Sequence, residues 1–143
     1  MKLKQLSIMI PNQPGALVRI CEILQKAQIN ISTLTLADTA DFGILRLIIK
    51  DWEAAKNALE SNALVVKVSD VLAISIPNEP GGLLGVLNTL NSNKINVEYM
   101  YGFSLATGKQ SVQIFRLNDP DHAIDILNKA HICVLGSGEL FGN

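Results

Sequence analysis

The chain has few of the residues that usually carry catalysis or metal binding. Its 143 residues include two cysteines and two histidines, and only 5% are aromatic. Cys21 and Cys133 lie too far apart for zinc-site spacing and fall within apolar patterns, so we predict buried, reduced thiols. His122 and His131 accompany no serine or cysteine motif. We therefore expect surface or capping histidines, no bound metal and no catalytic residues.

An excess of one charge is also missing. Twelve basic and thirteen acidic residues leave a net charge of −1, and the basic residues are scattered. Affinity for nucleic-acid backbones needs clustered Lys and Arg, so we expect no nucleic-acid partner. The charged fraction of 17% and the hydrophobic fraction of 48% predict a folded chain rather than a disordered one.

Long apolar runs are absent as well. No stretch approaches the roughly 20 apolar residues that a membrane-spanning helix needs. The N-terminal residues MKLKQLSIMI lack the apolar core and the small-residue cleavage site of a secretory signal. We expect a soluble, cytoplasmic protein without a membrane partner.

What the chain does contain is an internal repeat. The pentapeptide PNQPG begins at Pro11, and PNEPG begins at Pro77, 66 residues later. The same offset relates other pairs, namely Leu6 and Leu72, Ile8 and Ile74, Ile10 and Ile76, Leu17 and Leu83, Leu24 and Leu90, and Asn30 and Asn96. Beyond the following strands the offset becomes 68, as for Asp51 and Asp119, which a two-residue insertion explains. We predict two copies of one unit, residues 1–69 and 70–143.

Each copy begins with a strand and a helix. Apolar residues alternate before the loop, which predicts a half-buried strand. After the loop they recur with the i, i+3, i+4, i+7 spacing of one helix face. The two stripes are Leu17, Ile20, Cys21 and Leu24, and Leu83, Val86, Leu87 and Leu90. Pro14 and Pro80 suit the first helical position, where a missing N–H costs nothing.

A hairpin, a second helix and a final strand complete each copy. The predicted strands are 29–37, 44–50 and 65–68, then 95–105, 111–117 and 132–135, with turns at 37–43 and 106–109. Asp51 and Asp119 are placed to cap the second helices, and Pro120 starts the last one. This order, β-α-β-β-α-β twice, predicts an α+β protein of two ferredoxin-like units in tandem, with antiparallel sheets and helices on one face.

Three further expectations concern the connections between and around the units. Residues 64–76 read as one extended stretch broken only at Ser69–Asp70, so we expect the units to pack rigidly. The final GSGEL, starting at Gly136, has no helix pattern after it and reads as a turn. Asp38 and Asp41 lie in one predicted turn. Aspartates favour turns, and this explains the pair more simply than a metal site does.

Two strands are apolar on more than one face. In the first copy the residues are Ile44, Leu45, Leu47, Ile48 and Ile49; in the second a stripe of Val97, Tyr99, Tyr101 and Phe103 faces away from Met100. A sheet that is apolar on both sides should be covered on both sides. We predict packing between units and a homodimer, and an overpacked core is the alternative.

The twin loops are the candidate binding sites. Prolines restrict the backbone around Asn12, and Gly15 leaves the main chain open at a helix start, where free N–H groups attract a carboxylate. Asn12 precedes Asn30 by 18 residues, as Asn78 precedes Asn96. Two amides and free helix N–H groups suit a small zwitterion. Alternatively, the asparagines only cap helices or stabilise turns.

At these residues the chain resembles the ACT domain family, a regulatory module of amino-acid metabolism. The motif N-x-P-G before a helix and the I-N-I/V sequence after it occur in both copies, so the resemblance covers nearly the whole chain, as a free-standing tandem pair. In the serine-binding ACT domain of phosphoglycerate dehydrogenase, two asparagines at the matching positions hold the ligand across an interface. By resemblance, these positions are Asn12 with Asn30 and Asn78 with Asn96.

The resemblance implies a non-catalytic sensor that binds a free amino acid where ACT units meet, without a cofactor, and acts on a metabolic enzyme or regulator. The implied ligand-binding residues are Asn12, Gln13, Pro14, Gly15, Ala16, Leu17, Asn30, Asn78, Glu79, Pro80, Gly81, Gly82, Leu83 and Asn96. An interaction scaffold that binds no ligand is the alternative, like the ACT-pair accessory of glycine cleavage repression. An acylphosphatase-like enzyme would need an arginine in the loop, and neither loop has one.

Overall fold

The computed structural model of the chain describes residues 1–104 and 108–142, and for Phe103 the backbone only. The chain divides into two compact units. The N-terminal unit is Lys4–Ser69, and the C-terminal unit runs from Asp70 to the end of the chain and includes Met1–Leu3. Among the described residues, no helix has both the length and the apolar character needed to cross a membrane.

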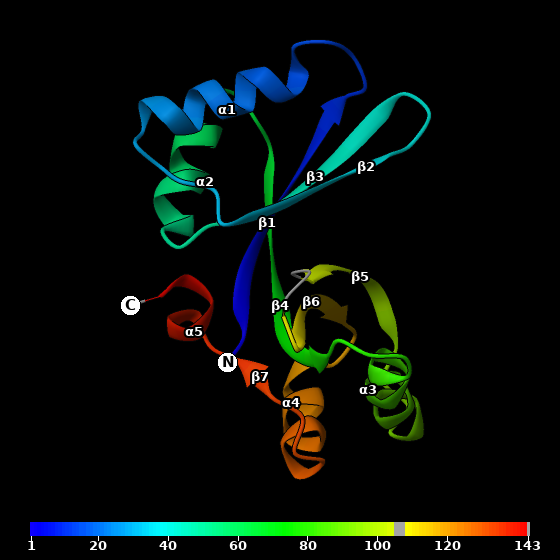
Figure 1. Ribbon diagram of the computed structural model, residues 1–143. Helices are drawn as coiled ribbons and strands as arrows, with labels where there is room; N and C mark the ends of the chain where they lie inside the picture. The colour runs from blue at the N-terminus through cyan, green and yellow to red at the C-terminus, as the bar shows by residue number, and fades with distance from the viewer. Residues whose placement is uncertain (105–107, 143) are drawn as a thin grey trace. The chain divides into compact units, whose positions relative to one another are not determined.

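The N-terminal unit is a four-stranded antiparallel sheet with two helices (Figure 1). Its elements are β1 (Leu3–Pro11), α1 (Ala16–Lys26), β2 (Thr33–Asp38), β3 (Phe42–Ile48), α2 (Trp52–Glu60) and the first residues of β4 (Val66–Pro77). The strand order is β2-β3-β1-β4. Ile8 on β1 and Leu36 on β2 both oppose Leu45 of the central strand β3, so β1 and β2 run parallel on either side of it.

One apolar core joins the helices to the sheet of this unit. Buried side chains of β1 and β3 pack against those of α1 and α2, and α1 contacts α2. The residues are Leu6, Ile8, Ile10, Ile20, Ile23, Leu24, Leu45, Leu47, Ile49, Ala55, Leu59 and Val66. The alternating positions of β1 thus face both helices, which confirms the predicted one-sided arrangement.

The C-terminal unit repeats this plan. It contains the rest of β4, then α3 (Gly82–Ser92), β5 (Val97–Ser104), β6 (Gln110–Leu117), α4 (Pro120–Lys129), β7 (Val134–Leu135) and α5 (Ser137–Phe141). The strand order is β7-β4-β6-β5. Phe115 of β6 is the largest fully buried side chain, and it packs with Leu72, Ile74 and residues of α3 and α4. Both units have the predicted ferredoxin-like order.

Aspartate side chains cap the second helix of each unit. The Asp51 carboxylate accepts the Ala54 N–H of α2 at 3.3 Å, and the Asp119 carboxylate accepts the His122 N–H of α4 at 3.1 Å. Pro120 stands at the first position of α4. Both predicted caps are confirmed.

The strand boundaries predicted from apolar runs are wrong at several places. The second strand begins at Thr33 rather than residue 29, because Ile29 and Ile31 pack on the core from a loop instead of pairing in the sheet. Strand β4 continues through Ser69–Asp70 without the predicted break. The last strand is only Val134–Leu135. The predicted strand end at 105 and the predicted turn at 106–109 fall largely on residues 105–107, outside the described residues.

Other differences concern side-chain orientation. Cys21 and Cys133 are free and exposed rather than buried. Cys21 falls just outside the buried face of α1, and Cys133 lines a cavity while the next residue, Val134, is buried. A bulge between Val97 and Tyr99 shifts the alternation of β5, so Val97 and Met100 both contact the core. The predicted stripe of Val97 with Tyr99 and Tyr101 is therefore interrupted, and the Phe103 side chain lies outside the described residues.

The C-terminal GSGEL is also not a turn. Residues Ser137–Phe141 form the short helix α5. The Glu139 carboxylate accepts the Gly136 N–H at 3.1 Å, so an acidic residue in the first turn stabilises this helix. The helix has no periodic apolar pattern from which it could be predicted.

Candidate ligand sites at the proline-glycine loops

Both loops contain a type II turn that sets the start of a helix. The Gln13 carbonyl accepts the Ala16 N–H at 3.4 Å, with Pro14 and Gly15 at the central positions. Gly15 has φ 88° and ψ −18°, the left-handed conformation that this turn requires at its third residue. The second loop repeats the geometry, with Gly81 at φ 85°. These glycines are therefore explained by the turn itself.

This turn places the prolines outside the helices. α1 begins at Ala16 after the N-cap residue Gly15, and α3 begins at Gly82 after Gly81. The prediction that Pro14 and Pro80 occupy the first helical position is wrong, because the left-handed glycine must separate each proline from its helix.

Among the described residues, no side chain caps the first turn of α1 or of α3. In α1 the first N–H bonded to the preceding turn is that of Arg19, to the Gly15 carbonyl at 3.0 Å. The N–H groups of Leu17 and Val18 have no acceptor among the described residues. Asn12 thus does not cap the helix, and the helix start remains available to an anionic group.

The two loop asparagines differ in their hydrogen bonds. Their backbone N–H groups are equivalent, since Asn12 donates to Asp41 O at 3.0 Å and Asn78 to Lys109 O at 2.9 Å. The Asn78 side-chain amide also donates to the Gly108 carbonyl at 3.3 Å. Across residues 1–104 and 108–142, the Asn12 side chain has no hydrogen bond. The purely structural reading thus fits Asn78 and does not account for Asn12.

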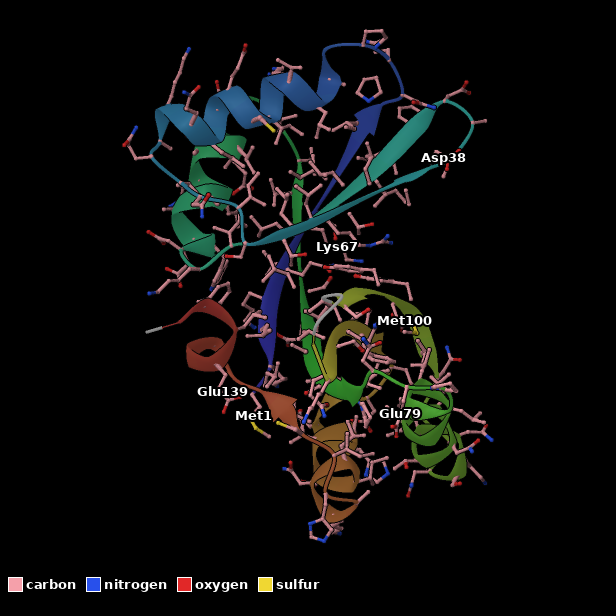
Figure 2. The ribbon with its side chains drawn as sticks, in the orientation of Figure 1. Met1, Asp38, Lys67, Glu79, Met100 and Glu139 are labelled. Atoms are coloured by element: carbon pink, nitrogen blue, oxygen red, sulfur yellow. The ribbon has the colours of Figure 1, made fainter. Side chains whose placement is uncertain are left out.

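A cavity of about 180 Å³ lies beside Asn12 in the N-terminal unit. The first loop and α1 form one wall, with Asn12, Gln13, Ala16 and Leu17, and the β2–β3 hairpin forms the other, with Leu36, Ala37, Asp38 and Gly43. At roughly 30 Å³ per water molecule, its volume suits a small ligand. Figure 2 shows Asp38 at the tip of this hairpin.

Sequence reasoning missed Asp38 as part of this site. It treated Asp38 only as a turn residue, whereas Asp38 lines the same cavity as Asn12. The available signal was the element order: β1 and β2 run parallel on either side of β3, so their C-terminal ends meet at one edge of the sheet.

The second asparagine of each copy lies at the other end of its sheet. Pro11 opposes Phe42 at one end of β3, whereas Ile48 at the other end opposes both Gln5 and Thr33. The start of β2, which Asn30 precedes, is thus about 20 Å along the sheet from the loop, at roughly 3.3 Å per residue. Asn96 likewise lies beside Asn118, whose carboxamide oxygen accepts the Asn96 N–H at 2.9 Å. One unit therefore does not bring its two asparagines together.

The second loop borders a different and larger cavity, of about 700 Å³. Its walls are the loop Glu79–Gly82, the α3 residues Gly85 and Thr89, the end of β4, and residues 130–133 after α4. Figure 2 marks Glu79 near the start of α3. Within the described part of the chain, no three His, Cys, Asp or Glu residues are grouped to hold a metal ion.

The fold and these loops define a class: paired ferredoxin-like units that each present an uncapped helix start after an N-x-P-G turn. The chain belongs to the ACT domain family, because the family model for an ACT domain pair matches residues 1–140. This confirms the resemblance drawn from the sequence and places the protein in a regulatory family, and no catalytic family is indicated.

Solved structures agree with this assignment. Protein BT0572 from Bacteroides thetaiotaomicron is 38% identical over 100% of this chain and 98% of its own, with a TM-score of 0.92. The regulatory subunit of aspartate kinase from Thermus flavus shares the fold, with a TM-score of 0.66 and 19% identity over 92% of each chain. The regulatory subunit of aspartate kinase from Thermus thermophilus also shares the fold, with a TM-score of 0.63 and 17% identity over 91% of each chain. The curated proteins contain no match.

Proposed function

We propose that this protein is a non-catalytic amino-acid sensor whose first loop holds the ligand. The observation that carries the proposal is the cavity beside α1, which Asn12, Asp38 and the first residues of the helix line. Among the described residues, the Asn12 amide has no hydrogen bond and the helix start has no side-chain cap. Membership of the ACT family and the shared fold with regulatory subunits of aspartate kinase support a regulatory role.

The chemistry of this cavity matches both ends of an amino acid. The ligand carboxylate would accept hydrogen bonds from the free N–H groups at the start of α1, where the helix dipole favours negative charge. The ligand ammonium would face Asp38, and the Asn12 amide oxygen is a further acceptor. Gln13, Pro14, Gly15, Ala16 and Leu17 would shape the cavity and its turn. We do not assign this ligand to the second loop, because the Asn78 amide is already bonded to the Gly108 carbonyl.

A homodimer through β2 would complete the site. β2 pairs only with β3 among the described residues, and its side chains Leu34 and Leu36 are 46% and 47% exposed. Two β2 strands pairing antiparallel would put the start of one strand, with Asn30, opposite the end of the other, with Asp38. Asn30 of the second copy would then face the first loop, which is the cross-interface arrangement that the family resemblance implies.

A thermal-shift screen of the twenty amino acids tests the ligand site. One of them should stabilise the protein in a concentration-dependent way, by about 2.7 kcal/mol at 100 times its Kd. For a chain of this size that is about 5–10 °C in Tm. Asn12→Ala and Asp38→Asn should abolish the shift, and the matched variant Asn78→Ala should retain most of it.

Two outcomes would contradict this proposal. If no amino acid raises Tm at millimolar concentration, the alternative of a scaffold that acts only through protein contacts is correct. If Asn78→Ala removes the shift and Asn12→Ala does not, the ligand is bound at the second loop.

The dimer edge has its own test. Leu34→Lys should shift the protein from dimer to monomer in size-exclusion chromatography with light scattering, because a lysine on an edge strand opposes edge-to-edge pairing. Val65→Lys is the matched control, since Val65 is 86% exposed and lies outside β2. A monomeric wild-type protein at high concentration, or a dimer that Leu34→Lys leaves intact, would overturn this interface.

A further inference from the structure

An arginine bridges the two helices of the N-terminal unit. Arg19 of α1 donates from its guanidinium Nη2 to the Asn62 carbonyl at 2.5 Å, just after the end of α2. Carbonyls at a helix C-terminus attract cationic donors because the helix dipole is negative there. Arg19 also lines two cavities, one of about 210 Å³ with the first loop and Leu64, and one of about 420 Å³ with Ala58 and Asn62.

The C-terminal unit has no arginine at the position equivalent to Arg19. Gly85 stands where Arg19 stands in the first copy, and Ala130 stands where Asn62 does. A Cβ atom added to Gly85 would meet no atom of the described residues within 4 Å, so the space there is open. The corresponding cavity, which we call the α3 groove, has a volume of about 700 Å³ and is lined by Gly85 and Ala130. Gly85 thus lines one cavity of about 700 Å³, where Arg19 of the first copy lines two smaller ones.

The α3 groove has acceptors for a cation. Among the described residues no donor bonds to the Ala130 carbonyl, which corresponds to the carbonyl that Arg19 bonds in the first copy. The groove is also lined by Glu79, whose carboxylate has no ion pair among those residues. Val86, Ile132 and Pro80 supply apolar contact for an alkyl chain. A carboxylate, an open carbonyl and apolar walls suit a flexible chain with a cationic end.

We propose that the α3 groove binds a small molecule with an aliphatic chain ending in a guanidinium or ammonium group. The cationic group takes the place that the Arg19 guanidinium has in the first copy, donates to the Ala130 carbonyl and faces Glu79. This site shares no residue with the cavity around Asn12, so it is a second site with its own ligand chemistry.

Isothermal titration at pH 7.5 with four probes tests the proposal. Agmatine and arginine carry a guanidinium, lysine carries an ammonium, and citrulline has the shape of arginine with a neutral end. At least one cationic probe should bind at least 10-fold more tightly than citrulline. Agmatine binding would show that the α-carboxylate is dispensable; binding of arginine or lysine alone would show that the site takes basic amino acids.

Variants locate the site. Gly85→Arg supplies the cation from the chain itself and should weaken binding at least 10-fold, whereas Gly85→Ala places only a methyl group in open space and should keep binding. Glu79→Gln should weaken binding several-fold. Arg19→Gly, the reverse change in the other copy, should leave the binding constant of the α3 groove unchanged.

Failure of this proposal is distinguishable from failure of the amino-acid site. Equal binding of all four probes, no binding at millimolar concentration, or unchanged binding by Gly85→Arg would overturn the cation site. Asn12→Ala should retain cation binding, and its loss in that variant would mean that the probe occupies the first cavity instead. Circular dichroism on each variant verifies that the fold is intact.

Discussion

Replacing Phe115 with alanine should lower the free energy of unfolding by about 3–5 kcal/mol. The side chain is fully buried on β6, opposite Leu72 of β4 and Met100 of β5, and packs in the core of the C-terminal unit. Truncation removes a large apolar surface from the core and leaves a cavity that dense neighbours fill only in part.

Guanidinium denaturation followed by far-UV circular dichroism measures this loss. Phe42→Ala is the matched control, because Phe42 is 47% exposed, and it should cost about 1 kcal/mol or less. Trp52 is the single tryptophan and packs on the core of the N-terminal unit, so its fluorescence reports on that unit alone. A Phe115→Ala protein within 1 kcal/mol of the wild type would contradict the assigned core.

The repeat made most of the fold predictable from the sequence. A half-buried strand, an N-x-P-G loop and an apolar helix face occur twice in the same order, and the aspartates that begin α2 and α4 use purely local chemistry. Such features depend on neighbours within a few residues, so the sequence displays them directly. The family assignment rests on the same local motifs.

Burial without pairing explains where strand prediction failed. Ile29 and Ile31 have the alternation of a strand, yet they contact the core from the loop that follows α1. Cys21 fits the helical stripe by spacing, yet the buried face of α1 is centred on Ile20, Ile23 and Leu24. An apolar pattern reports that a residue is near the core, and only the register decides which residues pair or point inward.

The candidate site was predictable in its loop and not in its partners. The sequence identified Asn12 through the PNQPG motif, but the approach of Asp38 depends on β1 and β2 ending at the same edge of β3. The same register separates Asn30 from that loop within one unit. The sequence could not predict that the Asn78 amide has a hydrogen bond and that the Asn12 amide has none among the described residues, because the difference lies in contacts with the facing hairpin.

Gly82→Ala should produce the second large effect, a destabilisation of about 1–3 kcal/mol. A Cβ atom at Gly82 would lie 2.1 Å from the Pro77 carbonyl oxygen and 3.1 Å from its carbon. Both are backbone atoms, so the loop or the start of α3 must move. The first copy tolerates alanine at the equivalent Ala16 and has a looser turn there, with an N–H to carbonyl distance of 3.4 Å against 3.0 Å for Gly82.

Urea denaturation of Gly82→Ala beside the reciprocal variant Ala16→Gly measures this difference. Ala16→Gly should cost about 1 kcal/mol, since it creates no clash and changes only helix propensity and one partly buried methyl group that packs on the core. Because Glu79 and Gly82 both line the α3 groove, moving this loop should also weaken agmatine binding in Gly82→Ala. If Gly82→Ala is as stable as the wild type, the loop accepts a side chain at no cost. The tight turn would then not explain why the second loop has glycine where the first has alanine.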